Sequence, residues 1–224
     1  MKRLPVYLLL DTSGSMMGTP IMQVEQGIKQ LITDLKQDPT ACETAHFSII
    51  TFNDKPEQKT ELVSLIDFPD DLSLRPQGRT ALGAALRFVA ERASSEVQKK
   101  TSGSPGDWKP IFIIMSDGVP TDDWRSGLEV FRKPNVKWGI RIAGAVDEAF
   151  RDETSLDALN EIIAGDNPKE GTYKLVKLGT ANPREIAAFF LLLTQTIKQY
   201  SDSVGTEAGG SNFVLPELDN IYMV

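Results

Sequence analysis

Short apolar runs recur along the chain, and stretches with helical periodicity separate most of them. The first run, Val6 to Leu10, is apolar at successive positions rather than at alternate ones, which is typical of a central strand buried on both faces. Five further strands are expected at residues 46–52, 61–65, 111–115, 138–146 and 173–178, of which the one at 61–65 is weaker.

Helical patterns fill the intervals between these runs. Thr19 and Pro20 resemble a cap and a first-turn proline, and apolar residues then recur at helical spacing as far as Leu35. Further helices are expected at residues 81–93, between Asp122 or Asp123 and Pro134, at 156–163 up to Gly165, and from Asn182 to about Tyr200. Because strands and helices alternate, right-handed crossovers should place helices on both faces of a mostly parallel sheet. The sequence therefore predicts a doubly wound, Rossmann-like α/β sandwich of three layers.

The 224 residues are expected to form one such domain, over residues 1–200. The remaining segment, 201–224, begins with a Gly-rich, polar linker at 201–211 and ends in a short apolar tail at 213–224. Apolar termini rarely stay free, so the tail is expected to dock on the domain.

Composition argues against several classes of partner and cofactor. The 24 basic and 31 acidic residues give a formal charge of -7, which disfavours nucleic acid and anionic membrane surfaces as partners. Cys42 is the single cysteine, so neither an intrachain disulfide nor a cysteine-ligated zinc or iron–sulfur centre is expected. No small-residue cleavage site follows Leu10, and the longest apolar block, Ile186 to Leu193, is much shorter than the ~20 residues that span a bilayer. A cytoplasmic location is therefore expected.

Oxygen-bearing side chains follow two of the apolar runs. Asp11, Ser13 and Ser15 come directly after the first run, Asp117 follows the run at 111–115, and Thr80 lies on a loop between them. Ligands of such sheets bind outside the carboxyl ends of the strands, where Asp11 and Asp117 both fall. Short hydroxyl ligands with a few retained waters suit Mg²⁺. The pattern predicts a divalent metal site, with Mg²⁺ as the expected ion and Mn²⁺ or Ca²⁺ as alternatives.

Each of these residues also has an ordinary structural explanation. Ser and Asp at a strand-to-helix turn commonly satisfy loop amides, and Asp117 before Gly118 fits a simple turn. Thr80 could cap the helix that follows it. It is the joint occurrence of all five residues at strand ends and loops that favours a metal site.

The same residues resemble a known pattern. In the von Willebrand factor A (VWA) family, the metal-ion-dependent adhesion site (MIDAS) has Asp-x-Ser-x-Ser, then a distant Thr and a distant Asp. Five residues of this chain occupy those places: Asp11, Ser13, Ser15, Thr80 and Asp117. The likeness covers roughly Leu4 to Tyr200. Segments 13–21 and 116–124 look like those of the bacterial tellurite-resistance (TerY-like) group, which implies a cytoplasmic protein working beside a protein kinase and a protein phosphatase in a stress response.

The resemblance implies a non-catalytic, metal-dependent protein-binding module, of the adhesion or scaffold kind. Ser13, Ser15 and Thr80 would coordinate the ion, Asp11 and Asp117 would act directly or through water, and a position left open would accept a carboxylate from a protein partner. Three more residues are candidates for partner contact: Arg79, Trp124 and Arg125. Many relatives carry glycine where this chain has Arg79, and a cation there could repel the ion or pin an acidic partner. For Trp124, packing on its own helix is an equally open reading.

An enzymatic function is the alternative. A carboxylate after a buried strand, with Mg²⁺, is also found in the haloacid-dehalogenase phosphohydrolases. If this chain resembled them, Asp11 would be the nucleophile. In those enzymes the motif is Asp-x-Asp, and its second aspartate is the general acid. In this chain the corresponding residue is Ser13, which cannot take that role. Neither of the common glycine-rich nucleotide motifs occurs in the sequence. The sequence therefore predicts a protein that is not an enzyme.

Overall fold

The computed structural model describes residues 2–133, 136–150, 152–165, 172–180, 182–204 and 213–217. Within these residues, six strands form one sheet in the order β3-β2-β1-β4-β5-β6, and β2 and β3 are the antiparallel pair. The strands are β1 (Leu4–Asp11), β2 (Ala45–Phe52), β3 (Pro56–Ser64), β4 (Ile111–Ser116), β5 (Ile140–Val146) and β6 (Tyr173–Leu178).

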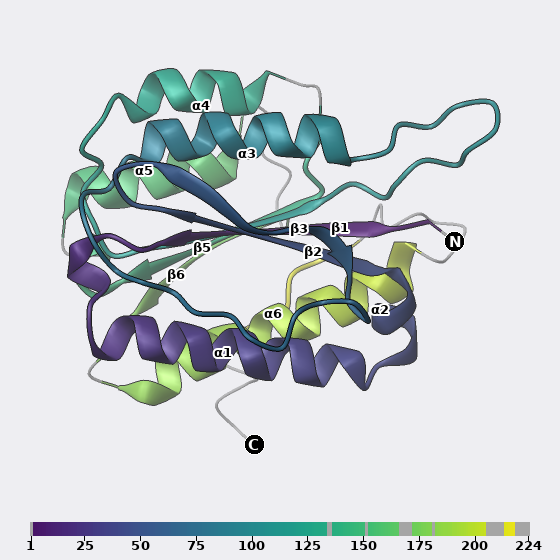
Figure 1. The fold of residues 1–224 in the computed structure, drawn as a ribbon, viewed down its shortest axis with the longest axis horizontal. Coiled ribbons are helices and arrows are strands. Elements are labelled where there is room, and N and C mark those ends of the chain that lie inside the picture. Colours follow the sequence, from purple (N-terminus) through teal and green to yellow (C-terminus); the bar gives the residue numbers. More distant parts are fainter. Residues whose placement is uncertain are drawn as a thin grey trace.

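Helices cover both faces of this sheet (Figure 1). One face carries α1 (Thr19–Lys36), α2 (Pro39–Thr44) and α6 (Pro183–Val204), and the other carries α3 (Leu82–Glu96), α4 (Trp124–Arg132) and α5 (Glu153–Ala164). Two short 3-10 helices, η1 (Gly14–Met16) and η2 (Asp147–Phe150), follow β1 and β5. The predicted doubly wound α/β architecture is confirmed.

The central strand β1 shows why its sequence is apolar throughout. Successive side chains of a strand point to opposite faces of the sheet. Val6, Leu8 and Leu10 accordingly pack in the core beneath α1 and α6, whereas Tyr7 and Leu9 pack in the core beneath α3, α4 and α5. Burial on both faces removes the alternation that a half-exposed strand would display.

Some elements differ from the sequence predictions. β3 begins at Pro56 rather than near residue 61, because most of its side chains alternate between solvent and partial burial at the sheet edge and give little apolar signal. The short helix α2 was not predicted, although Asp38 caps it by accepting from the Ala41 N–H at 2.9 Å, and Pro39 begins it. α6 continues past Tyr200 to Val204, so residues 201–204 are helical rather than linker.

Part of the expected tail lies against the domain. Phe213 meets Tyr200 edge to face at 5.2 Å between ring centroids, and Leu215 is buried. Lys174 Nζ in β6 donates to the Pro216 carbonyl at 3.0 Å. Residues 205–212 and 218–224 lie outside the described part of the chain. Among the helices that the structure describes, none combines the length and apolar character needed to cross a bilayer.

Candidate metal centre

The strand order reverses between β1 and β4, and the predicted site lies at this point. β1 pairs in parallel with β2 on one side and β4 on the other, so the loops after β1 and β4 diverge to opposite faces of the sheet. A crevice outside the carboxyl ends of the strands forms where such loops part. Asp11 is the last residue of β1, and Asp117 immediately follows β4.

Three of the predicted ligands form direct hydrogen bonds with one another. Ser15 Oγ donates to Asp117 Oδ1 at 2.9 Å, and Ser13 Oγ lies 3.5 Å from the same oxygen. The two serine hydroxyls are 3.0 Å apart. Ser13 and Asp117 are buried, whereas Ser15 is exposed, so the cluster opens to solvent on the Ser15 side.

Asp11 lies beneath this cluster and is fully buried, with no exposed surface. Its Oδ1 accepts from the Ser13 N–H at 2.8 Å, and its Oδ2 accepts from Ser116 Oγ at 2.5 Å. Burial raises the pKa of Asp11 to about 6, against the opposing effect of these donors. Burial also raises the pKa of Asp117. Two carboxylates are thus held in a place where negative charge is costly.

The loop that carries Thr80 is hydrogen-bonded to the loop after β1 and to the loop after β4. The Gly14 N–H donates to the Gly78 carbonyl at 3.1 Å, and the Thr121 N–H donates to the Thr80 carbonyl at 2.9 Å. A Cβ placed on Gly118 would come within 2.7 Å of Thr80 Oγ1, so the Thr80 hydroxyl lies directly against the loop of Asp117. The three ligand loops therefore form one interlocked unit.

Two further acids in the third loop hold helices in place. Asp123 caps α4 by accepting from the Ser126 N–H at 3.1 Å. Asp122 instead caps α3 from across the site, since its two carboxylate oxygens accept from the N–H groups of Gly83 and Ala84 at 2.8 and 2.9 Å. The sequence left open whether Asp122 or Asp123 caps the helix before Pro134, and the structure assigns that role to Asp123. Both carboxylates therefore bind N–H groups at helix N-termini.

The donor set fits a hard cation. It combines the carboxylates of Asp11 and Asp117 with three hydroxyls, and it offers no thiolate or imidazole. Within the part of the chain that the structure describes, no group of three or more His, Cys, Asp and Glu side chains gathers, so hydroxyls must supply much of any coordination. That composition suits Mg²⁺ with retained waters better than zinc.

The predicted partner-binding residues differ in accessibility. Arg79 is exposed, and its backbone N–H donates to Asp54 Oδ1 at 3.0 Å. The Arg125 guanidinium lies 4.4 Å from the centre of the Trp124 ring and 3.9 Å from Glu161, and its side chain is 66% exposed. Trp124 itself is only 5% exposed and belongs to the core beneath α3, α4 and α5. Packing is therefore the reading that the structure supports for Trp124.

Sequence reasoning missed two supporting groups. Ser116, which donates to Asp11, ends β4 and was identifiable only as a hydroxyl adjacent to Asp117. Asp147 follows β5 with a left-handed φ of 40°, accepts from the backbone N–H and the hydroxyl of Thr180, and adds to the raised pKa of Asp117 through its charge. Nothing in its local sequence marks Asp147 as a neighbour of the site.

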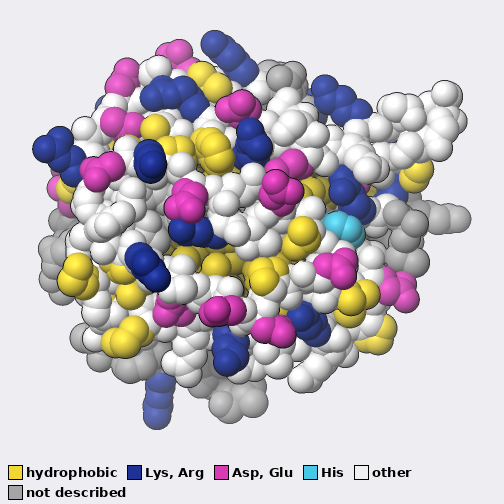
Figure 2. Space-filling view, in the orientation of Figure 1, with side chains coloured by type: hydrophobic (Ala, Val, Ile, Leu, Met, Phe, Trp, Pro, Cys, Tyr) yellow, Lys and Arg dark blue, Asp and Glu magenta, His cyan; other side chains and the backbone are white. Residues whose placement is uncertain are grey.

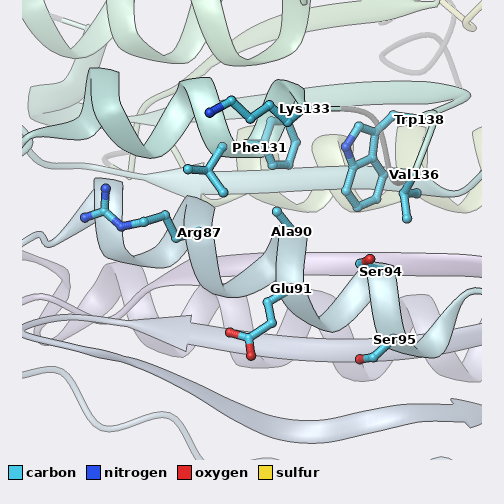
Figure 3. Close-up of a pocket in the computed structure, with 10 residues that line it drawn as sticks. Arg87, Ala90, Glu91, Ser94, Ser95, Phe131, Lys133, Val136 and Trp138 are labelled. Atoms are coloured by element: carbon cyan, nitrogen blue, oxygen red, sulfur yellow. The ribbon is translucent and has the colours of Figure 1, made fainter.

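A separate groove lies between α3 and α4 (Figure 3). It has a volume of about 620 Å³, and Phe131, Val136 and Trp138 contribute apolar surface to it, with Arg87 and Glu91 also lining it. Its α3 residues lie along the middle and end of the helix, away from the N-terminus that Asp122 caps. The groove is distinct from the hydroxyl and carboxylate cluster, whose side chains hydrogen-bond to one another, and that cluster remains the candidate site.

The face shown in Figure 2 carries charges of both signs. In the view of Figure 2, basic and acidic side chains are interspersed rather than gathered by sign. This mixture agrees with the net negative charge of the chain.

Fold and site together define a class of protein, an α/β domain with a cluster of hydroxyl and carboxylate side chains at the switch point of its sheet. The sequence matches the von Willebrand factor type A domain family over residues 6–182, and the chain belongs to that family. No curated protein matches the chain in a sequence search.

Solved structures share the fold at low sequence identity. The PilB minor pilin from Streptococcus sanguinis is 12% identical with a TM-score of 0.61, over 88% of this chain and 62% of that one. The pilus adhesin SpaC from Lactobacillus rhamnosus GG, in its open conformation, is 14% identical with a TM-score of 0.65, over 89% and 30%. A von Willebrand factor type A protein from Catenulispora acidiphila is 16% identical with a TM-score of 0.57, over 88% and 43%. The chain thus spans less than two thirds of each of these structures.

Proposed function

We propose that this VWA domain is a non-enzymatic, Mg²⁺-dependent protein-binding module. The observation that carries the proposal is the convergence of Ser13, Ser15 and Asp117 above the buried Asp11. Two carboxylates belong to this cluster, and their hydrogen bonds come from hydroxyl and backbone donors. A dication would compensate that charge.

In this proposal Ser13, Ser15 and Thr80 hold the ion through their hydroxyl oxygens, and Asp11 and Asp117 act directly or through water. When bound, the ion supplies an electron-poor position that can accept a carboxylate from a partner. Asp11 orients the Ser13 and Ser116 groups that donate to it, and the exposed Ser15 side leaves room for an incoming side chain. The exposed Arg79, which precedes Thr80 in the chain, would add positive charge near the ion.

The geometry disfavours the phosphohydrolase alternative. A nucleophilic carboxylate needs a free oxygen facing the substrate. Both Asp11 oxygens accept hydrogen bonds and the residue has no exposed surface, so a phosphoester has no path to it without rearrangement. Steady hydrolysis of a generic phosphomonoester that is lost in Asp11→Asn would reverse this preference.

The cellular setting is also part of the proposal. The resemblance of segments 13–21 and 116–124 to the TerY-like group supports a cytoplasmic role in a bacterial tellurite-resistance or stress system, with an acidic surface of its protein kinase or phosphatase as the partner. Affinity capture from cells in Mg²⁺ and in chelator tests this setting. Capture of a kinase or phosphatase in Mg²⁺ alone is expected, and an identical set of proteins under both conditions would argue against metal-bridged binding.

Titration calorimetry with Mg²⁺ tests the ion site itself. Wild-type protein is expected to bind the ion, and Asp117→Ala is expected to lose that binding because it removes the shared acceptor of Ser13 and Ser15. Asp70→Ala is the matched control, since it removes a carboxylate whose side chain is 97% exposed. Equal heats from wild type and Asp117→Ala would contradict the assignment.

A further inference from the structure

Each of the three ligand loops carries an exposed side chain of a different residue type beside its candidate ligand. Met17 lies two residues after Ser15 and is 66% exposed, and Val119 lies two residues after Asp117 and is 47% exposed. Arg79 immediately precedes Thr80 and is also exposed. Single exposed apolar residues are ordinary on a protein surface, but here each of two lies only two positions after a candidate ligand, on separate loops that meet at the site.

The backbone beside these side chains is already hydrogen-bonded within the domain. The Met17 N–H donates to the Gly14 carbonyl at 3.2 Å, and Gly14 in turn is bonded to Gly78. On the other side, Ser155 Oγ donates to the Gly118 carbonyl at 3.2 Å, next to Val119. Because the backbone is already fixed, covering these side chains costs little ordering of the loops.

We propose that Met17 and Val119 form an apolar rim that contacts the residues flanking the partner's carboxylate. The inference rests on the proposed function, because the carboxylate itself is to be held at the ion. The positive charges of the bound cation and of Arg79 favour an acidic residue on the partner. The apolar rim then selects its neighbours, so the partner segment is an acidic residue flanked by apolar side chains. Methionine suits such a surface because its flexible thioether adapts to different shapes.

Two short peptides test this inference by NMR titration of labelled protein in Mg²⁺. One is capped Gly-Leu-Glu-Leu-Gly and the other is capped Gly-Gly-Glu-Gly-Gly. The leucine-flanked peptide is expected to bind about tenfold more tightly, since partial burial of two apolar side chains on each partner yields roughly that ratio.

Variants locate the source of the difference. A double variant, Met17→Gln with Val119→Thr, is expected to bring the two dissociation constants together while leaving Mg²⁺ binding and the glycine-flanked peptide unchanged. Ile66→Gln is the matched control, because Ile66 is also exposed, at 64%. The backbone N–H of its neighbour Leu65 donates to the Ala45 carbonyl at the start of β2, so Ile66 lies near the amino-terminal end of the strands, away from the site. This control should keep the tenfold ratio.

The outcomes separate the two proposals. Mg²⁺-dependent binding with equal affinities for both peptides would overturn the apolar rim alone, as would a tenfold ratio that persists in the double variant. If neither peptide binds in an Mg²⁺-dependent way, the proposed function is overturned together with the inference.

Discussion

The two ends of the sheet both bury carboxylates, but they treat the charge differently. At the amino-terminal end of β1, the Arg3 guanidinium donates to both oxygens of Asp107 at 2.9 and 2.7 Å. Nearby, Glu96 accepts from the Tyr7 hydroxyl at 2.9 Å and from Gln58 at 2.7 Å. At the carboxyl end, Asp11 and Asp117 have hydroxyl and backbone donors, and no ion pair to either is found among the described residues.

The comparison separates a structural polar cluster from a candidate binding site. The Arg3–Asp107 pair is complete, and the hydrogen bond with Asp107 raises the pKa of Arg3. The Asp11 cluster lacks a positive partner, and burial raises the pKa of its carboxyl. A cluster that is complete within its own chain stabilises the fold, whereas one that lacks a counter-charge is suited to acquiring a cation.

The largest expected effect lies at the complete end. Asp107→Asn should lower the free energy of unfolding by about 3 to 5 kcal/mol, because it leaves the Arg3 guanidinium without its counter-charge. The Asp107 side chain is only 1% exposed and that of Arg3 only 24%, so water can replace the lost contact only in part. Urea unfolding measures the change, and Mg²⁺ binding should be unaffected. A loss below 1 kcal/mol would mean that this end is not the structural cluster described above.

The converse is expected at the incomplete end. The folded-state pKa of Asp11, about 6, lies above the ordinary value, so protonated Asp11 contributes stability below about pH 4 that is lost as the pH rises through about 6. In chelator at pH 7, Asp11→Asn should therefore be more stable than wild type, by up to about 3 kcal/mol. Urea unfolding between pH 4 and pH 7 checks this sign, and the difference should shrink toward pH 4. A variant that is less stable than wild type at pH 7 would contradict the comparison.

Adding Mg²⁺ should stabilise wild type but not variants that lack a carboxylate of the site. At a hundredfold excess over the dissociation constant the gain is about 2.7 kcal/mol, enough to raise the melting temperature by several degrees. Asp11→Asn and Asp117→Asn are expected to show no such rise, whereas Glu96→Gln, at the other end of the sheet, should keep it. A rise in all four proteins would place the ion elsewhere.

Arg79→Gln should have the smallest effect. Its side chain is exposed, so unfolding stability should stay within about 0.5 kcal/mol of wild type. The association rate of an acidic peptide should fall, and its dependence on salt should weaken, because steering by an exposed charge is screened by ions. Stopped-flow measurements at two salt concentrations check both effects. A faster association in the variant would indicate that Arg79 hinders the entrance.

The sequence predicted the elements whose burial is unmistakable. Val6 to Leu10 is apolar on both faces because two cores share β1, and the final helix begins with a recognisable cap near Asn182. β3 was placed too late because an edge strand need not be apolar, and α2 was missed because six residues carry too little periodic signal. The local sequence pattern thus predicted the layers of the fold, but not the start of the edge strand or the shortest helix.

At the site, sequence order alone nominated residues that the fold does bring together. Asp11, Ser13, Ser15 and Asp117 are joined by hydrogen bonds, while the ion itself stays a prediction. The pairing of Asp122 with α3 could not be foreseen, because the acid and the helix start are separated by 38 and 39 positions and local capping rules favour α4. Asp147 was missed for the same reason, since only the sheet order brings the end of β5 beside the end of β4.

The reach of Asp122 across to α3 ties the mobility of two segments together. The loop that bears Asp117 cannot shift by more than a fraction of a hydrogen-bond length without releasing the amides of Gly83 and Ala84. A displacement of that loop that moves Asp122 would therefore fray the first turn of α3. Deuterium uptake at these two amides would report such a displacement from within the protein, whichever molecule caused it.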